Sequence, residues 1–128
     1  MKDFQYTVNS NKTFDAAVSA VEHSTTEKGF RVLHTHDVAA TLAEKSFARE
    51  PLKIVEVCNA RYASDALNQD VNVAVMLPCR IVIYTKDGKT FISTVRPSAL
   101  ADFYPDSGIE NIAAAMEKTV LEIVDAAK

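Results

Sequence analysis

Arg80-Ile-Val-Ile-Tyr-Thr-Lys-Asp-Gly-Lys-Thr-Phe-Ile-Ser-Thr-Val95 decides the fold of this chain. Aspartate followed by glycine, between two runs of β-branched and aromatic residues, is a strong signal for a two-residue hairpin turn. Such a turn fixes which residues of the two strands lie opposite each other. We therefore expect antiparallel strands at residues 80–85 and 89–95, with Tyr84 facing Phe91 and Ile83 facing Ile92. The same register would set Arg96 beside Cys79.

Both faces of this hairpin are apolar, and helices in a two-layer domain can cover only one of them. The other face would leave a contiguous apolar patch, which usually marks an interface or a ligand groove. We expect a homodimer through this outer sheet face. The alternative is that residues 47–51 and 97–107, the latter with Phe103 and Tyr104, fold over it. The two predicted faces carry Ile81, Ile83 and Ile92 on one side, and Val82, Tyr84, Phe91 and Val95 on the other.

The rest of the chain alternates strand and helix patterns around the hairpin. Apolar residues at helical spacing predict two long helices, one that begins at Phe14 and is closed by Gly29, and one over 108–127. The pattern as a whole predicts one α+β domain over 1–128, a two-layer structure whose mostly antiparallel sheet carries both long helices on one face. Further strands are expected at 3–9, 30–36 and 52–58, shorter helices at 38–46 and 60–68, and a short apolar segment at 73–77.

Composition and net charge argue against some classes of function. The 128 residues carry a net charge of −3, with 48% hydrophobic and 24% charged residues. That balance argues against a nucleic-acid or anionic-membrane partner held by bulk charge. Since no stretch approaches the ~20 apolar residues of a membrane span, and the N-terminal residues lack the pattern of a signal peptide, we expect a cytoplasmic protein. Its two cysteines are then expected to be thiols.

Cys58 and Cys79 are the strongest candidates for chemically functional residues. Cys58 ends one predicted strand and Cys79 begins the hairpin, so both thiols could meet at one edge of the sheet. A redox pair, half of a metal site and a thiol-handling site are all compatible with that placement, as are two small buried hydrophobes. Arg96 beside Cys79 would lower the pKa of the thiol. Burial of the same thiol on the face of Ile81 would raise it.

His34 and His36 alternate on a predicted strand and therefore point to one face. A His-x-His pair can supply two metal nitrogens, and a cysteine could complete the site. The alternative is two ordinary histidines at a strand end. Glu56 shares a strand face with Cys58, as a partly buried carboxylate or as part of a solvated edge. The sequence shows no glycine-rich phosphate loop and no nucleophile elbow.

Several short motifs carry a family resemblance over about residues 10–125, the most specific being Cys58-Asn59 and Leu77-Pro78-Cys79. The chain resembles the family designated domain of unknown function 302. The resemblance implies a two-layer α+β fold similar to the TATA-binding-protein-like group, dimeric members and no agreed activity, and it places Cys58, Asn59 and Cys79 together. The sequence departs from the family pattern at Ala60, Arg80, His34 and His36. The other motifs are Gly29-Phe30, Asp37-Val38, Ala66-Leu67 and Asp87-Gly88-Lys89.

The functional expectation is a small protein that binds a small ligand, an anion or a sulfur species, at a cysteine–asparagine–arginine cluster. One alternative is a thiol-dependent redox protein that cycles Cys58 and Cys79. Another is metal or haem binding through these cysteines and His34 or His36. A further alternative is a structural or interaction protein whose apolar sheet face is its whole function. No metal ligand is assigned, and no cofactor is identified. The expected ligand-binding residues are Cys58, Asn59, Cys79, Arg80 and Arg96.

Overall fold

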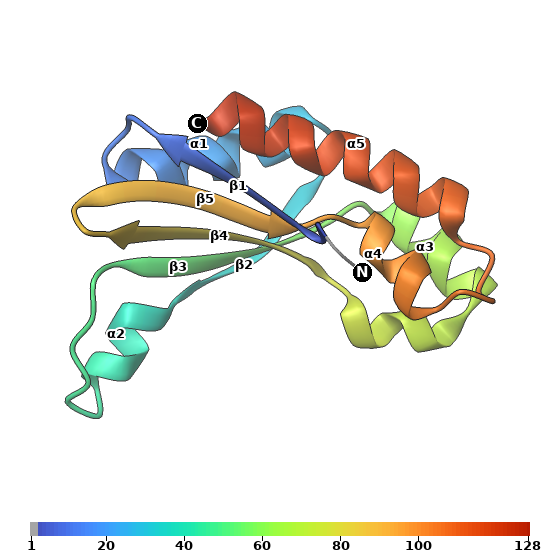
Figure 1. Ribbon diagram of the computed structural model, residues 1–128, viewed down its shortest axis with the longest axis horizontal. Helices are drawn as coiled ribbons and strands as arrows, with labels where there is room; N and C mark the ends of the chain where they lie inside the picture. The colour runs from blue at the N-terminus through green and yellow to red at the C-terminus, as the bar shows by residue number, and fades with distance from the viewer. Residues whose placement is uncertain (1–2) are drawn as a thin grey trace.

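The computed structural model describes residues 3–128 (Figure 1). Five antiparallel strands form one sheet in the order β1-β5-β4-β3-β2. The α+β expectation is confirmed. In chain order the elements are β1 (Gln5–Ser10), α1 (Phe14–Glu27), β2 (Arg31–Asp37), α2 (Val38–Ala43), β3 (Leu52–Cys58), α3 (Ala60–Gln69), the 3₁₀ helix η1 (Val71–Met76), β4 (Cys79–Lys86), β5 (Lys89–Val95), α4 (Ser98–Phe103) and α5 (Glu110–Ala127).

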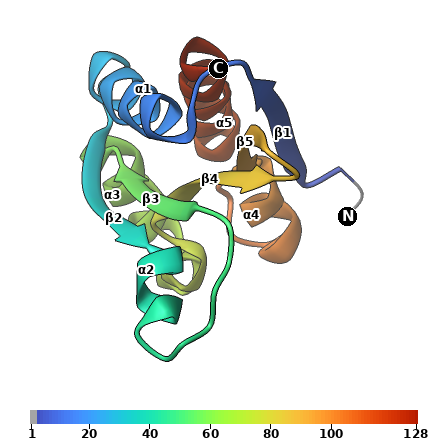
Figure 2. The same ribbon diagram turned by 90° about the vertical axis from the view of Figure 1, so that its left-hand side faces the viewer.

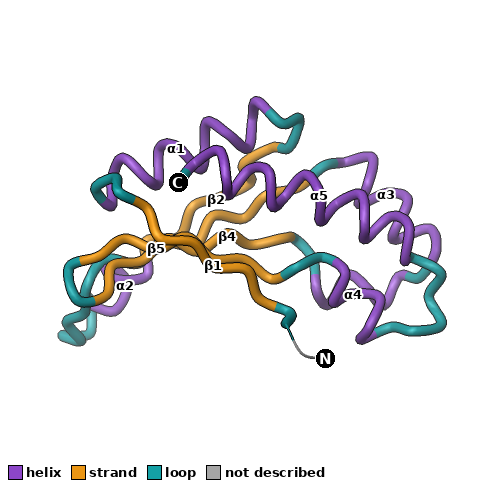
Figure 3. Tube along the Cα trace, turned by 45° about the horizontal axis from the view of Figure 1, so that its top comes forward, coloured by secondary structure: helices purple, strands orange, loops and turns teal. Residues whose placement is uncertain are grey.

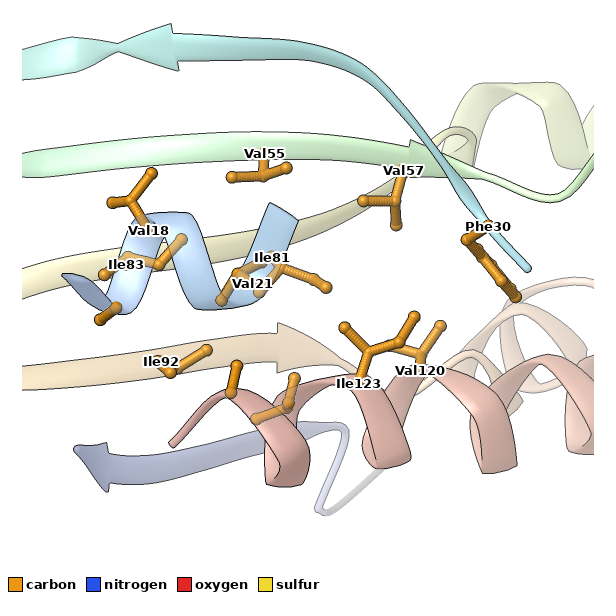
Figure 4. Close-up of a cluster of buried hydrophobic side chains, with 13 residues drawn as sticks. Val18, Val21, Phe30, Val55, Val57, Ile81, Ile83, Ile92, Val120 and Ile123 are labelled. Carbon is orange, nitrogen blue, oxygen red and sulfur yellow. The ribbon is translucent and has the colours of Figure 1, made fainter. Parts of the chain in front are cut away.

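The two long helices, α1 and α5, lie side by side over one face of the sheet (Figures 1 and 2). The core between these layers takes every second residue of the central strands, because side chains alternate between faces along a strand. Figure 4 shows this cluster, with Phe30 at its end beyond Val57 and Val120. Its fully buried members include Val55, Val57, Ile81, Ile83 and Ile92 from the sheet, and Val21, Val120 and Ile123 from the helices.

The hairpin forms in the predicted register. Ile83 lies opposite Ile92, and Tyr84 lies opposite Phe91 with their rings stacked at 5.2 Å between centroids. Asp87 and Gly88 adopt φ values of 52° and 77°, so both turn residues are left-handed. That conformation matches the twist of the flanking strands and explains why aspartate and glycine occupy these positions.

We define the outer sheet face as the face away from α1 and α5, and no helix of residues 3–128 covers its centre (Figures 1 and 3). Figures 1 and 3 show α2 near one end of this side and α4 near the other. Phe47 is 65% exposed and Phe103 is 54% exposed, and none of the described residues that line the groove on this face comes from 47–51 or 97–107. The homodimer through this face stays a prediction. A groove of about 430 Å³ runs across it, lined by Gln5, Leu52, Arg80, Val82, Tyr84, Ser93, Thr94 and Val95.

Residues 97–107 contain a helix, α4, where a loop was expected. Glu117 of α5 accepts hydrogen bonds from the backbone N–H of Ser98 at 3.1 Å and from its hydroxyl at 2.6 Å. These bonds tie the first turn of α4 to α5. Leu100 of α4 then joins a second apolar cluster with Ala66, Val73 and Ile109, against which Tyr104 packs. The local sequence carries no helical period long enough to show this, so the helix depends on tertiary contacts.

None of the helices within residues 3–128 combines the length and the hydropathy that a membrane crossing requires.

Candidate functional site

A cavity of about 260 Å³ lies where the sheet ends, between the main core and the second cluster. Its wall comes from the ends of β3 and β4, from α3, from η1 with the segment after it, and from α5. The lining is almost entirely apolar. The lining residues are Phe30, Val57, Cys58, Asn59, Ala63, Leu67, Ala74, Leu77, Pro78, Cys79 and Met116.

Asn59 shapes the cavity by starting α3. Its side-chain oxygen accepts a hydrogen bond from the backbone N–H of Tyr62 at 3.1 Å, which caps the helix N-terminus. Its side-chain nitrogen donates to the carbonyl of Gly29 at 3.2 Å and ties the helix to the chain that enters β2. Both polar ends of Asn59 are therefore engaged in holding the wall, and its contribution to the site is structural.

The expectation of neighbouring thiols needs correction. Cys79 lies opposite Val57 in the β3–β4 ladder, whereas Cys58 lies opposite Arg31 in the β2–β3 ladder. Because alternate strand residues face opposite sides, Cys79 begins the inward row of Ile81, and Cys58 belongs to the outward row. Both cysteines are free and half-buried. They line the same cavity, but they do not form a pair.

The Cys79 thiol is held in its protonated form. Burial raises its pKa from an ordinary 9.0 to about 11, and the Coulombic effect of Cys58 adds to the rise, while Arg80 opposes it. Of the two opposed effects that the sequence suggested, burial prevails. At neutral pH the Cys79 side chain is therefore an uncharged, polarisable thiol and not a thiolate nucleophile.

The two arginines do not join the cysteines in the cavity. Arg80 is exposed and lies on the outer sheet face, where it lines the groove. Arg96 follows the end of β5, and its guanidinium lies 5.1 Å from the ring centre of Tyr6 and 4.0 Å from Glu117. The expected five-residue cluster is therefore three cavity residues, Cys58, Asn59 and Cys79, with both arginines elsewhere. The β4–β5 ladder ends at Ile81 and Thr94, so Cys79 and Arg96 are not paired across it.

The histidines lie on β2, outside the cavity. The rings of His34 and His36 are 4.4 Å apart between centroids, and the Nε2 of His36 lies 3.3 Å from a carboxylate oxygen of Glu56. Within residues 3–128 no group of three or more histidine, cysteine, aspartate or glutamate side chains is arranged to hold a metal ion. The set of two cysteines with a histidine therefore does not come together.

Sequence reasoning missed most of the cavity wall. Met116 lies in the helix predicted over 108–127, and Phe30 in the strand predicted at 30–36. Leu77 and Pro78 were part of a motif without a role. In the sequence each of these residues has the pattern of an ordinary core residue. They line a cavity because two apolar clusters pack separately and leave a space between them.

Comparisons with known proteins agree with this fold. Residues 6–127 match the family model described as "Domain of unknown function DUF302". A similar solved structure is the crystal structure of an uncharacterised conserved DUF302 protein from Bacillus stearothermophilus. It is 32% identical, covers 98% of this chain and 99% of its own, and superposes with a TM-score of 0.93. No curated protein matches the chain.

Proposed function

We propose that this chain, which belongs to the DUF302 family, binds a small, uncharged and polarisable molecule in the cavity beside Cys79. A neutral thioether or a small aromatic ring has this chemistry. The observation that carries the proposal is the lining itself. It joins apolar side chains to three sulfur atoms, those of Cys58, Cys79 and Met116.

The lining favours an uncharged ligand over an anion. Among the described residues that line the cavity none is charged, and the one amide, that of Asn59, is already engaged in two hydrogen bonds. An anion moved there would lose its hydration without gaining a partner, which is strongly unfavourable. Sulfur atoms are polarisable and make favourable contacts with aromatic rings. Of the two ligand classes expected from the sequence, a sulfur-containing molecule therefore fits the cavity better than an anion.

The protonated state of Cys79 also favours binding over thiol chemistry. Disulfide exchange requires a thiolate as the attacking group. With a pKa of about 11, the Cys79 thiol supplies very little thiolate at neutral pH. The two cysteines also start from opposite faces of the sheet, which does not favour an internal disulfide. The redox alternative therefore has less support than a binding pocket.

The test is a thermal-shift titration with thioanisole, with benzoate as the charged probe of similar size. A ligand that binds only the folded chain raises its melting temperature. We expect a concentration-dependent rise with thioanisole and none with benzoate. Ala63→Phe, which places a ring in the cavity, should abolish the rise. Ala114→Phe, at an exposed position of α5, is the matched control and should keep it.

A second variant covers the case in which Ala63→Phe does not fold. Cys79→Val keeps the volume but removes the sulfur, so thioanisole should bind more weakly than to the original chain. Equal shifts for thioanisole in the original chain and in Ala63→Phe would contradict the proposal. So would a larger shift with benzoate than with thioanisole.

A further inference from the structure

Two histidines of the edge strand β2 lie close together on the outer sheet face. His34 and His36 are two residues apart, so their side chains leave the same face. Their rings lie 4.4 Å apart between centroids and are inclined at 76°. Both residues are exposed, and the side chain of His36 keeps 46% of its accessible surface. The pair is thus close together and reachable from solvent.

Glu56 of the neighbouring strand lies next to the pair and contacts His36. It lies directly opposite His34 in the β2–β3 ladder, and its carboxylate lies 3.3 Å from the Nε2 of His36. When that nitrogen carries the proton and donates to Glu56, the Nδ1 of His36 keeps a free lone pair. Metal-binding histidines commonly donate their other ring N–H to a carboxylate in this way, which fixes the tautomer and raises ligand basicity.

We propose that His34 and His36 together bind one divalent first-row transition-metal ion, of the class of Ni²⁺, Cu²⁺ and Zn²⁺, with Glu56 as the orienting carboxylate. Imidazole nitrogen suits these ions, and nitrogen ligands lie about 2.1 Å from zinc. The short separation of the rings is compatible with both reaching one ion. Two protein ligands leave the remaining coordination positions to water, since no third histidine, cysteine, aspartate or glutamate side chain completes a metal-binding group among residues 3–128.

The charges around His34 and His36 favour a cation only in the immediate neighbourhood of Glu56. Glu56 supplies a negative charge next to His36, while Arg80 lies opposite Glu56 on the next strand and offsets part of it. Asp37 follows His36, but its carboxylate accepts the backbone N–H of Ala40 at 2.9 Å and caps α2. The binding energy must therefore come mainly from the two nitrogens.

The test is calorimetric titration of the chain, free of any histidine tag, with Ni²⁺. We expect one ion per chain. His34→Ala and His36→Ala should each weaken binding by about tenfold or more, and Glu56→Gln should weaken it by about tenfold, the usual effect of losing an orienting partner. His23→Ala is the matched control. His23 lies on α1 and pairs with Glu27 at 2.7 Å, so its removal should leave the affinity unchanged.

Circular dichroism of each variant confirms that it is folded. Equal Ni²⁺ affinity in the original chain and in the variant that lacks both His34 and His36 would overturn the proposal. Absence of binding to the original chain at about 1 mM Ni²⁺, or an equal loss of affinity in His23→Ala, would overturn it as well. None of these results depends on the cavity, so the two proposals fail separately.

Discussion

Cys79 lies directly opposite Val57 in the β3–β4 ladder, and Cys58 therefore stands one residue out of register with it. One residue of offset turns a side chain to the other face of a sheet. The inward thiol of Cys79 packs at the cavity wall, where the loss of water contact raises its pKa to about 11. Cys79 therefore lines the cavity as a protonated thiol and does not stand beside Cys58 as one half of a redox pair.

The raised pKa predicts a loss of stability in alkaline solution. Between pH 9.0 and about 11 the unfolded chain releases the Cys79 proton while the folded chain keeps it. The folded state then binds more protons, so the free energy of unfolding falls as pH rises through this window. The stabilisation is fully present below pH 9.0. Urea unfolding across the window should show a loss of roughly 2 kcal/mol from this group, since one pKa unit corresponds to about 1.4 kcal/mol.

Two variants separate Cys79 from the other groups that titrate in alkali. Cys79→Val should flatten the decline by the amount that this thiol contributes, whereas Cys58→Val should keep most of it. An unchanged slope in Cys79→Val would show that the thiol is not desolvated in the folded chain.

Asn59→Ala should destabilise the chain by about 1–2 kcal/mol, because it removes the side-chain cap of α3 and the bond to the Gly29 carbonyl. Urea unfolding measures the loss. Asn68→Ala, at an exposed position of the same helix, is the control and should change stability by less than about 0.5 kcal/mol. Equal effects of the two substitutions would mean that the amide bonds of Asn59 do not hold the helix.

The outer sheet face predicts that two copies of the chain associate. Light scattering should report a mass of two chains of 14.0 kDa. Val95 is 43% exposed on this face, and Val95→Glu should shift the mass toward one chain because moving a charged carboxylate from water into the interface is unfavourable. Val71→Glu, at a 70% exposed valine of η1, should leave the mass unchanged. A single-chain mass for the original protein at micromolar concentration would remove the dimer.

The sequence predicts local geometry well and tertiary placement poorly. The hairpin register and the left-handed Gly29, with φ of 84°, follow from residues next to each other. The relative register of Cys58 and Cys79 depends on how β3 meets β4, and nothing in either strand alone fixes it. The predicted position of Arg96 assumes that the β4–β5 ladder continues to the start of β4, whereas its last pair is Ile81 with Thr94.

The cavity was the least predictable feature. Its residues belong to two apolar clusters that each pack well, and the space lies between them. Apolar periodicity places Met116 inside α5 without showing whether it meets protein atoms on every side. Cys58 and Cys79 stand out in the sequence because they lie at the ends of predicted strands, and Asn59 joins them through the family resemblance. The aliphatic wall carries no comparable signal.

The most direct test of the cavity is the ¹³C-methyl resonance of Met116 during titration with thioanisole. Met116 is 4% exposed and lines the cavity, so its methyl group meets solvent very little. A ring bound in the cavity should shift this resonance in a saturable way, with a midpoint that matches the thermal-shift titration, and Ala63→Phe should remove the shift. A Met116 resonance that stays in place while thioanisole stabilises the chain would contradict binding in this cavity.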